Sequence, residues 1–415
     1  MRWLYTLAIR GYAVAIALVA PFHAKAKLWR AGRKLLWHNL ELQCAGKQGI
    51  IWFHCASLGE YEQGKPLLQK LKAVKPDCTI LLTFFSPSGY ETVKNEPLAD
   101  IITYLPVDTH KNAVRFIEIV QPKCAVFVKY EYWYNIMQQL HNQNIPYYYI
   151  SAIFRPSQHF FKPYGRWFAR QLRQVTHFFV QNETSVQLLQ SIGIEQVTKT
   201  GDTRFDRVFA IASQDYQLPE IELFKQDKKL FIAGSSWSHD ENLLAALFPK
   251  IATDYKLIIA PHNIDKEHIK AILHKFAPYN PQCYTQATPA TLADTQVLVI
   301  DCIGLLSKIY KYSHIAYIGG AFKTGLHNTL EAAVFGVPLF FGSNYSKFNE
   351  AVSLVNLGGA FPIRTAEELY AILRKFENEP DYYNAVCGIC RQFIRENLGS
   401  TEVIFEKIMH AKNVM

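Results

Sequence analysis

The stretch from Ser57 to Glu60 directly follows an apolar run, Ile50–Phe53. The apolar run predicts a buried strand, and a helical pattern continues from about Tyr61 to Val74. A strand that breaks at serine and glycine before a helix exposes backbone N–H groups at the carboxyl edge of a parallel sheet, where α/β proteins bind ligands. Glu60 is therefore a candidate general base, because a carboxylate that the helix dipole keeps ionised can take a proton from a hydroxyl. The alternative is that Glu60 only caps the helix.

A second candidate, Arg204, lies in a turn between Asp202 and Asp206 and close to a predicted linker. An arginine near a cleft can neutralise a departing phosphate through charge-assisted hydrogen bonds. The alternative is a surface ion pair with either aspartate. Lys129 and Glu131 end another predicted strand and point the same way if that strand persists, although they can also simply pair with each other.

Three loops of the second half also follow predicted strands. Gly319 and Gly320 let a backbone approach a ligand, and a helix is expected to open near Asn328, its predicted N-cap, and to end near Gly336. Glu331, one turn in, can hold ribose hydroxyls, unless this is a capped core helix whose glutamate faces solvent. The other two loops, 234–236 with Ser235 and 260–263, end strands of the same predicted sheet, which favours a ligand site at that edge.

Strand-like and helical segments alternate in two runs along the chain. The first run follows Gly49, and the second resumes after a polar, proline-containing segment at about 211–229, the candidate linker. This alternation predicts an α/β protein with two doubly wound parallel sheets and a cleft between them. The expected strands are Ile50–Phe53, Thr79–Phe85, Ala125–Val128, Tyr147–Ile153, His177–Val180, Leu230–Ala233, Leu257–Ala260, Val297–Ile300, Ile315–Ile318 and Val337–Phe341.

The composition is that of a globular chain, with 415 residues, 49% hydrophobic and 19% charged, and a length that predicts two domains. We expect an apolar and basic segment at 1–34, a first domain at 35–212, a second domain at 213–400 and a C-terminal helix at 401–415 that can pack back on the first domain.

The N-terminal apolar run, Gly11 to Phe22, is shorter than the roughly 20 residues of a spanning helix. Basic residues follow it, so the pattern predicts a helix in the membrane interface. The alternative is a helix buried against the first domain. The net charge is +9, and its two basic clusters suit an anionic membrane better than nucleic acid: Lys25, Lys27, Arg30, Arg33 and Lys34, then Lys162, Arg166, Arg170 and Arg173.

Several enzyme classes are disfavoured by missing motifs. No G-x-G-x-x-G follows the first strand, and the chain has no P-loop, no D-x-D and no G-x-S-x-G elbow. Cys387 and Cys390 form the one C-x-x-C among eight cysteines, and without a second pair they predict reduced thiols rather than a zinc site.

Four motifs, taken in order, resemble the 3-deoxy-D-manno-oct-2-ulosonic acid (Kdo) transferases. Each motif is weak alone, but the ordered set is specific and spans most of the chain. The resemblance implies a GT-B fold of two Rossmann-like domains and an inverting transfer that needs no metal or other cofactor. It implies CMP-Kdo as donor and a phosphorylated lipid A precursor, lipid IVA, as acceptor, at the cytoplasmic face of the inner membrane. The motifs are 54–60, 131–135, 200–206, and Gly319-Gly320 with 327–331.

The same resemblance assigns roles to single residues. Glu60 corresponds to the general base, and Arg204 to the phosphate-stabilising cation, which is usually a lysine. Lys129 stands where better-known members carry a glutamate, so no carboxylate role is expected there, and Lys129 and Glu131 are secondary catalytic candidates. The implied CMP contacts include His262 in place of a usual arginine. With the strand-end residues above, the donor-binding candidates are Ser235, Pro261, His262, Ile303, Gly304, Leu305, Gly319, Gly320, Asn328, Thr329, Leu330 and Glu331.

Two rival functions stay open. One is another GT-B glycosyltransferase, or a sugar-nucleotide epimerase, that uses a UDP-sugar. The other is a non-catalytic membrane scaffold that kept the fold. Competition between CMP and UDP separates the first rival, and the absence of sugar transfer to a lipid A precursor identifies the second.

Overall fold

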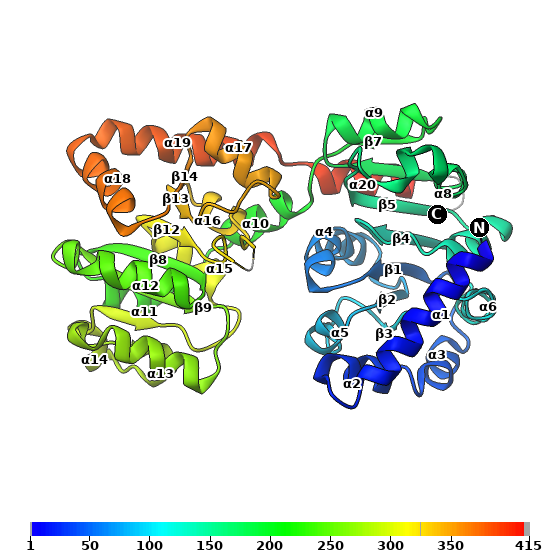
Figure 1. The fold of residues 1–415 in the computed structure, drawn as a ribbon, viewed down its shortest axis with the longest axis horizontal. Helices are drawn as coiled ribbons and strands as arrows, with labels where there is room; N and C mark the ends of the chain where they lie inside the picture. The colour runs from blue at the N-terminus through cyan, green and yellow to red at the C-terminus, as the bar shows by residue number, and fades with distance from the viewer. Residues whose placement is uncertain (1, 324, 411–415) are drawn as a thin grey trace. The chain divides into compact units, whose positions relative to one another are not determined.

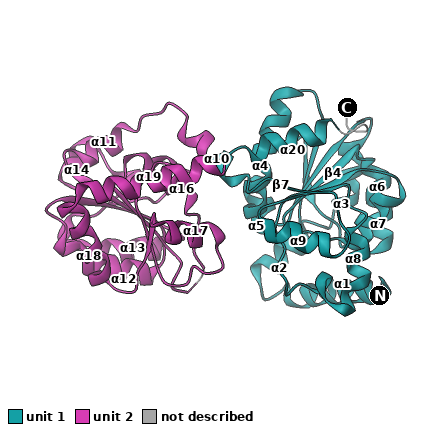
Figure 2. Cartoon of the chain, turned by 90° about the horizontal axis from the view of Figure 1, so that it is seen from above, with its two compact units in different colours: residues 1–207, 398–415 teal, residues 208–397 magenta. Residues whose placement is uncertain are grey.

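The computed structural model describes residues 2–323 and 325–410, which form two compact units (Figure 2). Unit 1 comprises Met1–Arg207 and Leu398–Met415, and unit 2 comprises Val208–Asn397. The division falls inside a helix, α10 (Arg204–Ala212). Part of the segment expected as a linker forms another helix, α11 (Pro219–Lys225). The cleft expected between the two halves stays a prediction.

Unit 1 is built on a parallel sheet of seven strands in the order β3-β2-β1-β4-β5-β6-β7 (Figure 1). The strands are β1 (Ile51–Cys55), β2 (Ile80–Phe84), β3 (Ile101–Tyr104), β4 (Cys124–Val128), β5 (Tyr147–Ala152), β6 (His177–Val180) and β7 (Val197–Lys199). Besides α10, the helices are α1 (Arg2–Val19), α2 (Ala24–Ala31), α3 (Leu36–Cys44), α4 (Leu58–Val74), α5 (Pro87–Val93), α6 (His110–Val120), α7 (Tyr134–Asn142), α8 (Arg166–Leu172), α9 (Glu183–Ser191) and α20 (Ser400–Met409).

Strand β1 shows why both faces of this sheet carry helices. Its residues are all buried, and successive side chains point to opposite faces. Phe53 packs in one core with α4 and α20, whereas Trp52 packs in another with α3, α6 and α7. A parallel strand covered on both faces reads as a continuous apolar run, which is the signal that the sequence carries here.

Unit 2 repeats this architecture with the strand order β10-β11-β9-β8-β12-β13-β14. Its strands are β8 (Lys229–Ser236), β9 (Tyr255–Pro261), β10 (Gln282–Cys283), β11 (Val297–Val299), β12 (Ile315–Ile318), β13 (Leu339–Phe341) and β14 (Ala360–Pro362). Its helices after α11 are α12 (Ser238–Leu247), α13 (Lys266–Lys275), α14 (Pro289–Asp294), α15 (Leu306–Ile309), α16 (Leu330–Ala333), α17 (Asn349–Leu357), α18 (Ala366–Asn378) and α19 (Pro380–Glu396). The predicted α/β class with two doubly wound parallel sheets is confirmed.

All ten expected strands are present, and the strands that the sequence did not predict are β3, β7, β10 and β14. These four are the edge strands of the two sheets. An edge strand has a partner on one side only and is often short, so its apolar run is weaker than that of a central strand. The two-residue β10 illustrates this loss of signal.

The N-terminal helix α1 lies on the surface of unit 1, and none of its residues is buried, which argues against the alternative of a buried helix. It is nevertheless docked on the unit, because the Tyr5 hydroxyl donates a hydrogen bond of 2.6 Å to the buried carboxylate of Asp108. Among the described residues, α1 is the one helix that is long and apolar enough, by length and composition, to cross a membrane.

The C-terminal helix α20 belongs to unit 1, where it packs on α4. Its start is fixed by Asp206, whose carboxylate accepts hydrogen bonds from the backbone N–H groups of Gly399 and Thr401, at 2.7 and 2.6 Å. Asp206 thus acts as a cap for a helix far along the sequence.

Candidate functional site

Glu60 lies in the first turn of α4, at the carboxyl end of β1, where the sequence places it. Its side chain is partly exposed, and its carboxylate accepts a short hydrogen bond from the hydroxyl of Ser57, the N-cap residue. A carboxylate in the first turn of a helix is favoured by the helix dipole. Glu60 therefore contacts the N-cap residue and is also accessible to a ligand.

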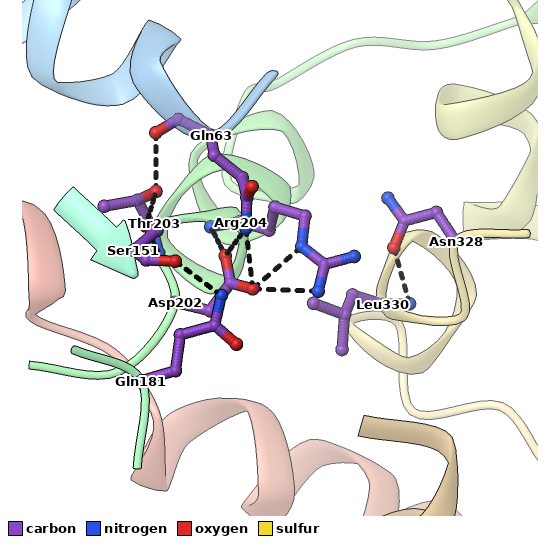
Figure 3. Close-up of polar contacts among 8 residues, drawn as sticks. All are labelled: Gln63, Ser151, Gln181, Asp202, Thr203, Arg204, Asn328 and Leu330. Carbon is purple, nitrogen blue, oxygen red and sulfur yellow. Dashed lines mark hydrogen bonds and ion pairs between the residues drawn. The ribbon is translucent and has the colours of Figure 1, made fainter. Parts of the chain in front are cut away.

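Arg204 opens α10 and is held by Asp202 (Figure 3). Its Nε and Nη2 donate to one oxygen of Asp202 at 3.0 and 2.8 Å, and its backbone N–H donates to the other oxygen at 2.9 Å. The Asp202 side chain is buried, so the guanidinium is held on a buried carboxylate and is itself about one-fifth exposed. The ion pair between Arg204 and an aspartate, which the sequence analysis gave as the alternative, is present. Its carboxylate is buried, and it fixes the orientation of the guanidinium.

Gln63 connects Glu60 to Arg204 within unit 1. Glu60 and Gln63 are three residues apart on α4 and so lie on neighbouring parts of one helix face. The Gln63 side-chain amide donates to both oxygens of Asp202 at 3.0 Å, and its backbone carbonyl accepts a hydrogen bond from Thr203 (Figure 3). The sequence analysis did not single out Gln63, because a buried glutamine inside a helix carries no local signal.

Tyr130 provides a second connection between the two candidates. Burial raises the pKa of its phenol, the charges of Arg155 and Arg204 lower it, and the charge of Glu60 raises it. Glu60 and Arg204 therefore both act electrostatically on one phenol at the carboxyl edge of the sheet. Strands β1, β4 and β5, which end beside these residues, are neighbours in the sheet.

Lys129 and Glu131 follow β4 but have different surroundings. Lys129 has a positive φ of 70°, a conformation that costs a residue with a side chain about 1 kcal/mol or more and that clusters at functional sites. Its ammonium lies 5.5 Å from the centre of the Tyr130 ring. The Glu131 carboxylate instead accepts hydrogen bonds from the buried His54 and from Trp133.

In unit 2 the predicted donor-binding loops lie at the ends of neighbouring strands, β11, β9, β8 and β12. Gly319 is required because a Cβ there would lie 2.3 Å from the carbonyl oxygen of Ser235. Gly320 has a φ of 92°, and a Cβ would lie 2.3 Å from the oxygen of Gly325. Ser235 also has a positive φ, of 53°. The loops can approach each other this closely because positions 319 and 320 are glycines, which have no Cβ.

A stack of three rings joins these loops. The ring of His262 stacks on Trp237 at 4.7 Å and on His327 at 4.5 Å, and Trp237 Nε1 donates to His327 Nε2 at 3.2 Å. Burial lowers the pKa of His262, and burial together with the charge of His262 lowers the pKa of His327 to about 4. Both imidazoles are neutral at pH 7, so His262 offers a ring, not a cation, to a ligand.

Asp240 ties two of the loops together. It accepts hydrogen bonds from the backbone N–H groups of Trp237 and Gly320, at 2.9 and 3.0 Å, and from the Tyr317 hydroxyl at 2.7 Å. The sequence analysis missed Asp240 and Trp237, although both directly follow the predicted 234–236 loop. They line, with neighbours, a cavity of about 230 Å³ bounded by Trp237, Ser238, His239, Asp240, Gly320, Phe322 and Lys323.

The segment from Asn328 to Glu331 differs from its prediction in length. Helix α16 has only four residues, and Asn328 lies just before it, accepting a 3.2 Å hydrogen bond from Leu330 N and donating one of 3.0 Å to Glu331. Thr329 and Leu330 are completely buried, backbone included. Of the remaining candidates, Pro261 ends β9, Ile303 is 89% exposed, and Gly304 and Leu305 lead into α15.

The two doubly wound parallel sheets, each with polar loops at its carboxyl edge, define a GT-B-like protein. Among solved structures, the chain is similar to UDP-GlcNAc 2-epimerase from Neisseria meningitidis, with a TM-score of 0.61 over 87% of this chain and 100% of that one. The sequence identity is 15%, so this likeness concerns the fold alone.

Sequence comparison finds similar proteins of one family. Residues 29–207 match the family model described as 3-Deoxy-D-manno-octulosonic-acid transferase (kdotransferase). The chain is 28% identical to 3-deoxy-D-manno-octulosonic acid transferase of Haemophilus influenzae over 381 residues, which cover 88% of this chain and 87% of the relative. It is 24% identical to the enzyme of the same name from Rickettsia typhi, over 83% of this chain and 75% of that one. The chain is therefore similar to Kdo transferases over most of its length.

Proposed function

We propose that the chain transfers Kdo from CMP-Kdo to a phosphorylated lipid A precursor, lipid IVA, in lipopolysaccharide biosynthesis. Similarity to Kdo transferases supports the sugar that is transferred. The observation that carries the catalytic assignment is the neighbourhood of Glu60 and Arg204, which act on one phenol and are connected through Gln63 and Asp202.

In the proposed reaction, Glu60 accepts the proton of an acceptor hydroxyl. The hydroxyl oxygen then forms a bond to the anomeric carbon of Kdo from the face opposite CMP, and the bond between that carbon and the CMP phosphate oxygen breaks. The transition state resembles an oxocarbenium ion, as in other glycosyl chemistry. Arg204 stabilises the charge of the leaving phosphate, because its guanidinium is fixed on Asp202 before the reaction.

The donor is proposed to bind to unit 2, at the loops that follow β8, β9, β11 and β12. Support comes from the glycines that let these loops approach each other and from the neutral ring of His262, which suits stacking better than ionic contact. Lys129 and Glu131 remain secondary candidates in unit 1. No metal or other cofactor is assigned a role.

We place the enzyme at the cytoplasmic face of the inner membrane, attached through α1. The outward side of α1 and the turn after it expose large apolar side chains, among them Leu7 at 58%, Leu18 at 70% and Phe22 at 90%. Exposed lysines follow in α2, and such a combination binds anionic bilayers. The Leu7→Glu/Leu18→Glu variant should lose flotation with phosphatidylglycerol vesicles while its melting temperature stays unchanged. If the parent and the double variant floated equally, membrane attachment through α1 would be rejected.

The direct test of the function is incubation with CMP-Kdo and a tetraacylated lipid A precursor, with the products read by mass spectrometry. We expect the mass of the acceptor to rise by one or more Kdo residues. Heat protection of the protein by CMP, and not by UDP, separates this reaction from UDP-sugar chemistry on the same fold. A chain that binds CMP but transfers no sugar would be a scaffold.

The role of Glu60 has its own test. Glu60→Gln should fold and bind CMP as the parent does but lose turnover by about 10²–10⁴-fold, the usual effect of removing a general base. Glu118→Gln, the same change at an exposed position on α6, is the control and should keep full turnover. Near-normal turnover of Glu60→Gln would remove Glu60 from this role.

A further inference from the structure

A buried chain of hydrogen bonds begins beneath the candidate site of unit 1. Trp52 Nε1 donates to Thr83 Oγ1 at 2.8 Å, and His54 Nδ1 lies 2.8 Å from the same hydroxyl oxygen. All three side chains are completely buried. The strand register explains the arrangement, because His54 lies directly opposite Thr83 on the neighbouring strand and Trp52 is two residues away on the same face.

The distances around Thr83 assign the protons of His54. The Thr83 hydroxyl has one hydrogen, which it can give to His54 Nδ1 at 2.8 Å or to the carbonyl oxygen of Phe53 at 3.3 Å. The shorter contact makes Nδ1 the acceptor, so the imidazole proton resides on Nε2.

The Nε2–H group of His54 points at Glu131. Nε2 lies 3.3 Å from Glu131 Oε2, and Trp133 Nε1 donates to the same oxygen at 2.9 Å, although it also lies 3.0 Å from His54 Nε2. The Glu131 side chain is 13% exposed. Within residues 2–323 and 325–410, no hydrogen bond reaches its second oxygen, Oε1, so two N–H groups hold one oxygen and the other is left for a ligand.

Glu131 lies at the same edge of the sheet as Glu60. Strands β1 and β4 pair in parallel, with His54 opposite Phe127, so the segments that carry Glu60 and Glu131 follow neighbouring strand ends. Burial raises the pKa of the Cys55 thiol at the end of β1, and the negative charges of Glu60, Glu131 and Glu62 raise it further. A carboxylate beside a general base is placed to stabilise positive charge that develops on a reacting sugar.

We infer that Glu131 is a second carboxylate of the transfer site and that His54, itself held by Thr83, is the residue that positions it. This inference rests on the proposed function. No proton is transferred to Glu131 in this step, and its Oε1 faces the sugar on which oxocarbenium character develops. The proton of the acceptor hydroxyl goes to Glu60, and no proton passes along the chain from Thr83 through His54.

The inference is tested first by kinetics. Thr83→Val keeps the volume of the side chain and removes the hydroxyl that fixes His54, so kcat should fall by about 10–100-fold, the effect of a misplaced group. KM for CMP-Kdo should stay within about twofold, because unit 2 binds the donor. The control is Thr103→Val, the same change at the residue paired with Thr83 on the next strand, which should leave both constants unchanged.

Substitutions of His54 provide the rescue experiment. Gln places an N–H donor near the position of Nε2, whereas Leu places none, so His54→Gln should turn over about tenfold faster than His54→Leu. Equal kcat for these two variants, or equal kcat for Thr83→Val and Thr103→Val, would overturn the positioning role while parental Kdo transfer leaves the proposed function intact.

A spectroscopic measurement does not depend on activity. In protein labelled with ¹⁵N-histidine, two-bond correlations should show His54 as the neutral Nε2–H tautomer, with its signals identified by their loss in His54→Gln. Thr83→Val should change this tautomer or its population. An Nδ1–H tautomer or a charged ring in the parent would overturn the inference, whereas absence of Kdo transfer by a parent with the expected tautomer would count against the proposed function.

Discussion

Asp202 holds the guanidinium of Arg204 through two hydrogen bonds to one carboxylate oxygen, at 3.0 Å from Nε and 2.8 Å from Nη2. Burial acts to raise the pKa of Asp202, but the charge and hydrogen bonds of Arg204 outweigh it and lower the pKa. The pair therefore stays ionised in a buried setting. Lysine, a point charge, would not be fixed in orientation in the same way, and this difference defines what arginine contributes at position 204.

The first prediction concerns Asp202→Asn. The change removes the charge that orients Arg204, so kcat should fall by about 10–100-fold. The melting temperature should also fall, because a buried ion pair is broken. The matched control is Asp206→Asn, two residues to the other side, which weakens the start of α20. It should lower the melting temperature but keep kcat. Equal kcat values in the two variants would contradict an orienting role for Asp202.

Arg33 gives a second prediction. Its guanidinium donates to the carbonyl oxygens of Trp29, Phe85 and Leu105 and lies over the rings of Trp29 and Tyr104. Burial lowers its pKa to about 9. Arg33→Met should destabilise unit 1 by about 2–4 kcal/mol, because three buried carbonyls lose their donor. Arg30→Met, at an exposed position of the same basic cluster, should leave the melting temperature unchanged. Thermal denaturation of both variants measures the difference.

Arg33 also shows where sequence reasoning failed. Sequence alone grouped it with Lys25, Lys27, Arg30 and Lys34 as a basic face, because charge spacing says nothing about long-range partners. Two of the three carbonyls that Arg33 binds belong to segments more than 50 residues away, at Phe85 and Leu105. The central strands could be predicted from their continuous apolar runs, because a strand buried on both faces needs such a run. The four edge strands could not be predicted in this way.

A third prediction concerns His262, which stacks between Trp237 and His327. His262→Arg introduces a cation that can reach the CMP phosphate, so CMP affinity should rise by about 3–10-fold and become more sensitive to salt. Titration calorimetry at two salt concentrations measures both effects. His274→Arg on α13, an exposed position, controls for the added charge. Weaker binding by His262→Arg would instead indicate that the ring stack itself holds the nucleotide.

Much of this site was predictable because parallel strands end at one edge of a sheet, so Glu60, Arg204 and the loops after Gly234, Ala260 and Ile318 follow from strand positions. The groups that hold them were not predictable. Gln63 and Asp240 act through contacts 139 and 80 residues along the chain. Their side chains are polar and buried, and only the folded register shows what they bond.

The last prediction concerns the anchor of α1. The carboxylate of Asp108 is completely buried, and burial raises its pKa to about 6, although hydrogen bonds from Tyr5, Asn135 N and Ile136 N act to lower it. The ordinary value in an unfolded chain is about 3.9. Between about pH 4 and 6 the folded state therefore binds more protons than the unfolded state, and the contribution of this group to stability falls as pH rises through that window, by about 2–3 kcal/mol in total.

Tyr5→Phe should steepen this dependence. Without the Tyr5 hydroxyl the ionised form of Asp108 loses one hydrogen bond, so its pKa should rise further and the loss of stability should extend to higher pH. The variant should match the parent in melting temperature near pH 5 and melt several degrees lower at pH 8. Tyr12→Phe, also on α1 but exposed and stacked on Phe85, should follow the parent at both pH values. A difference between Tyr5→Phe and the parent that is the same at pH 5 and pH 8 would show that packing of the ring, and not the ionised Asp108, secures α1.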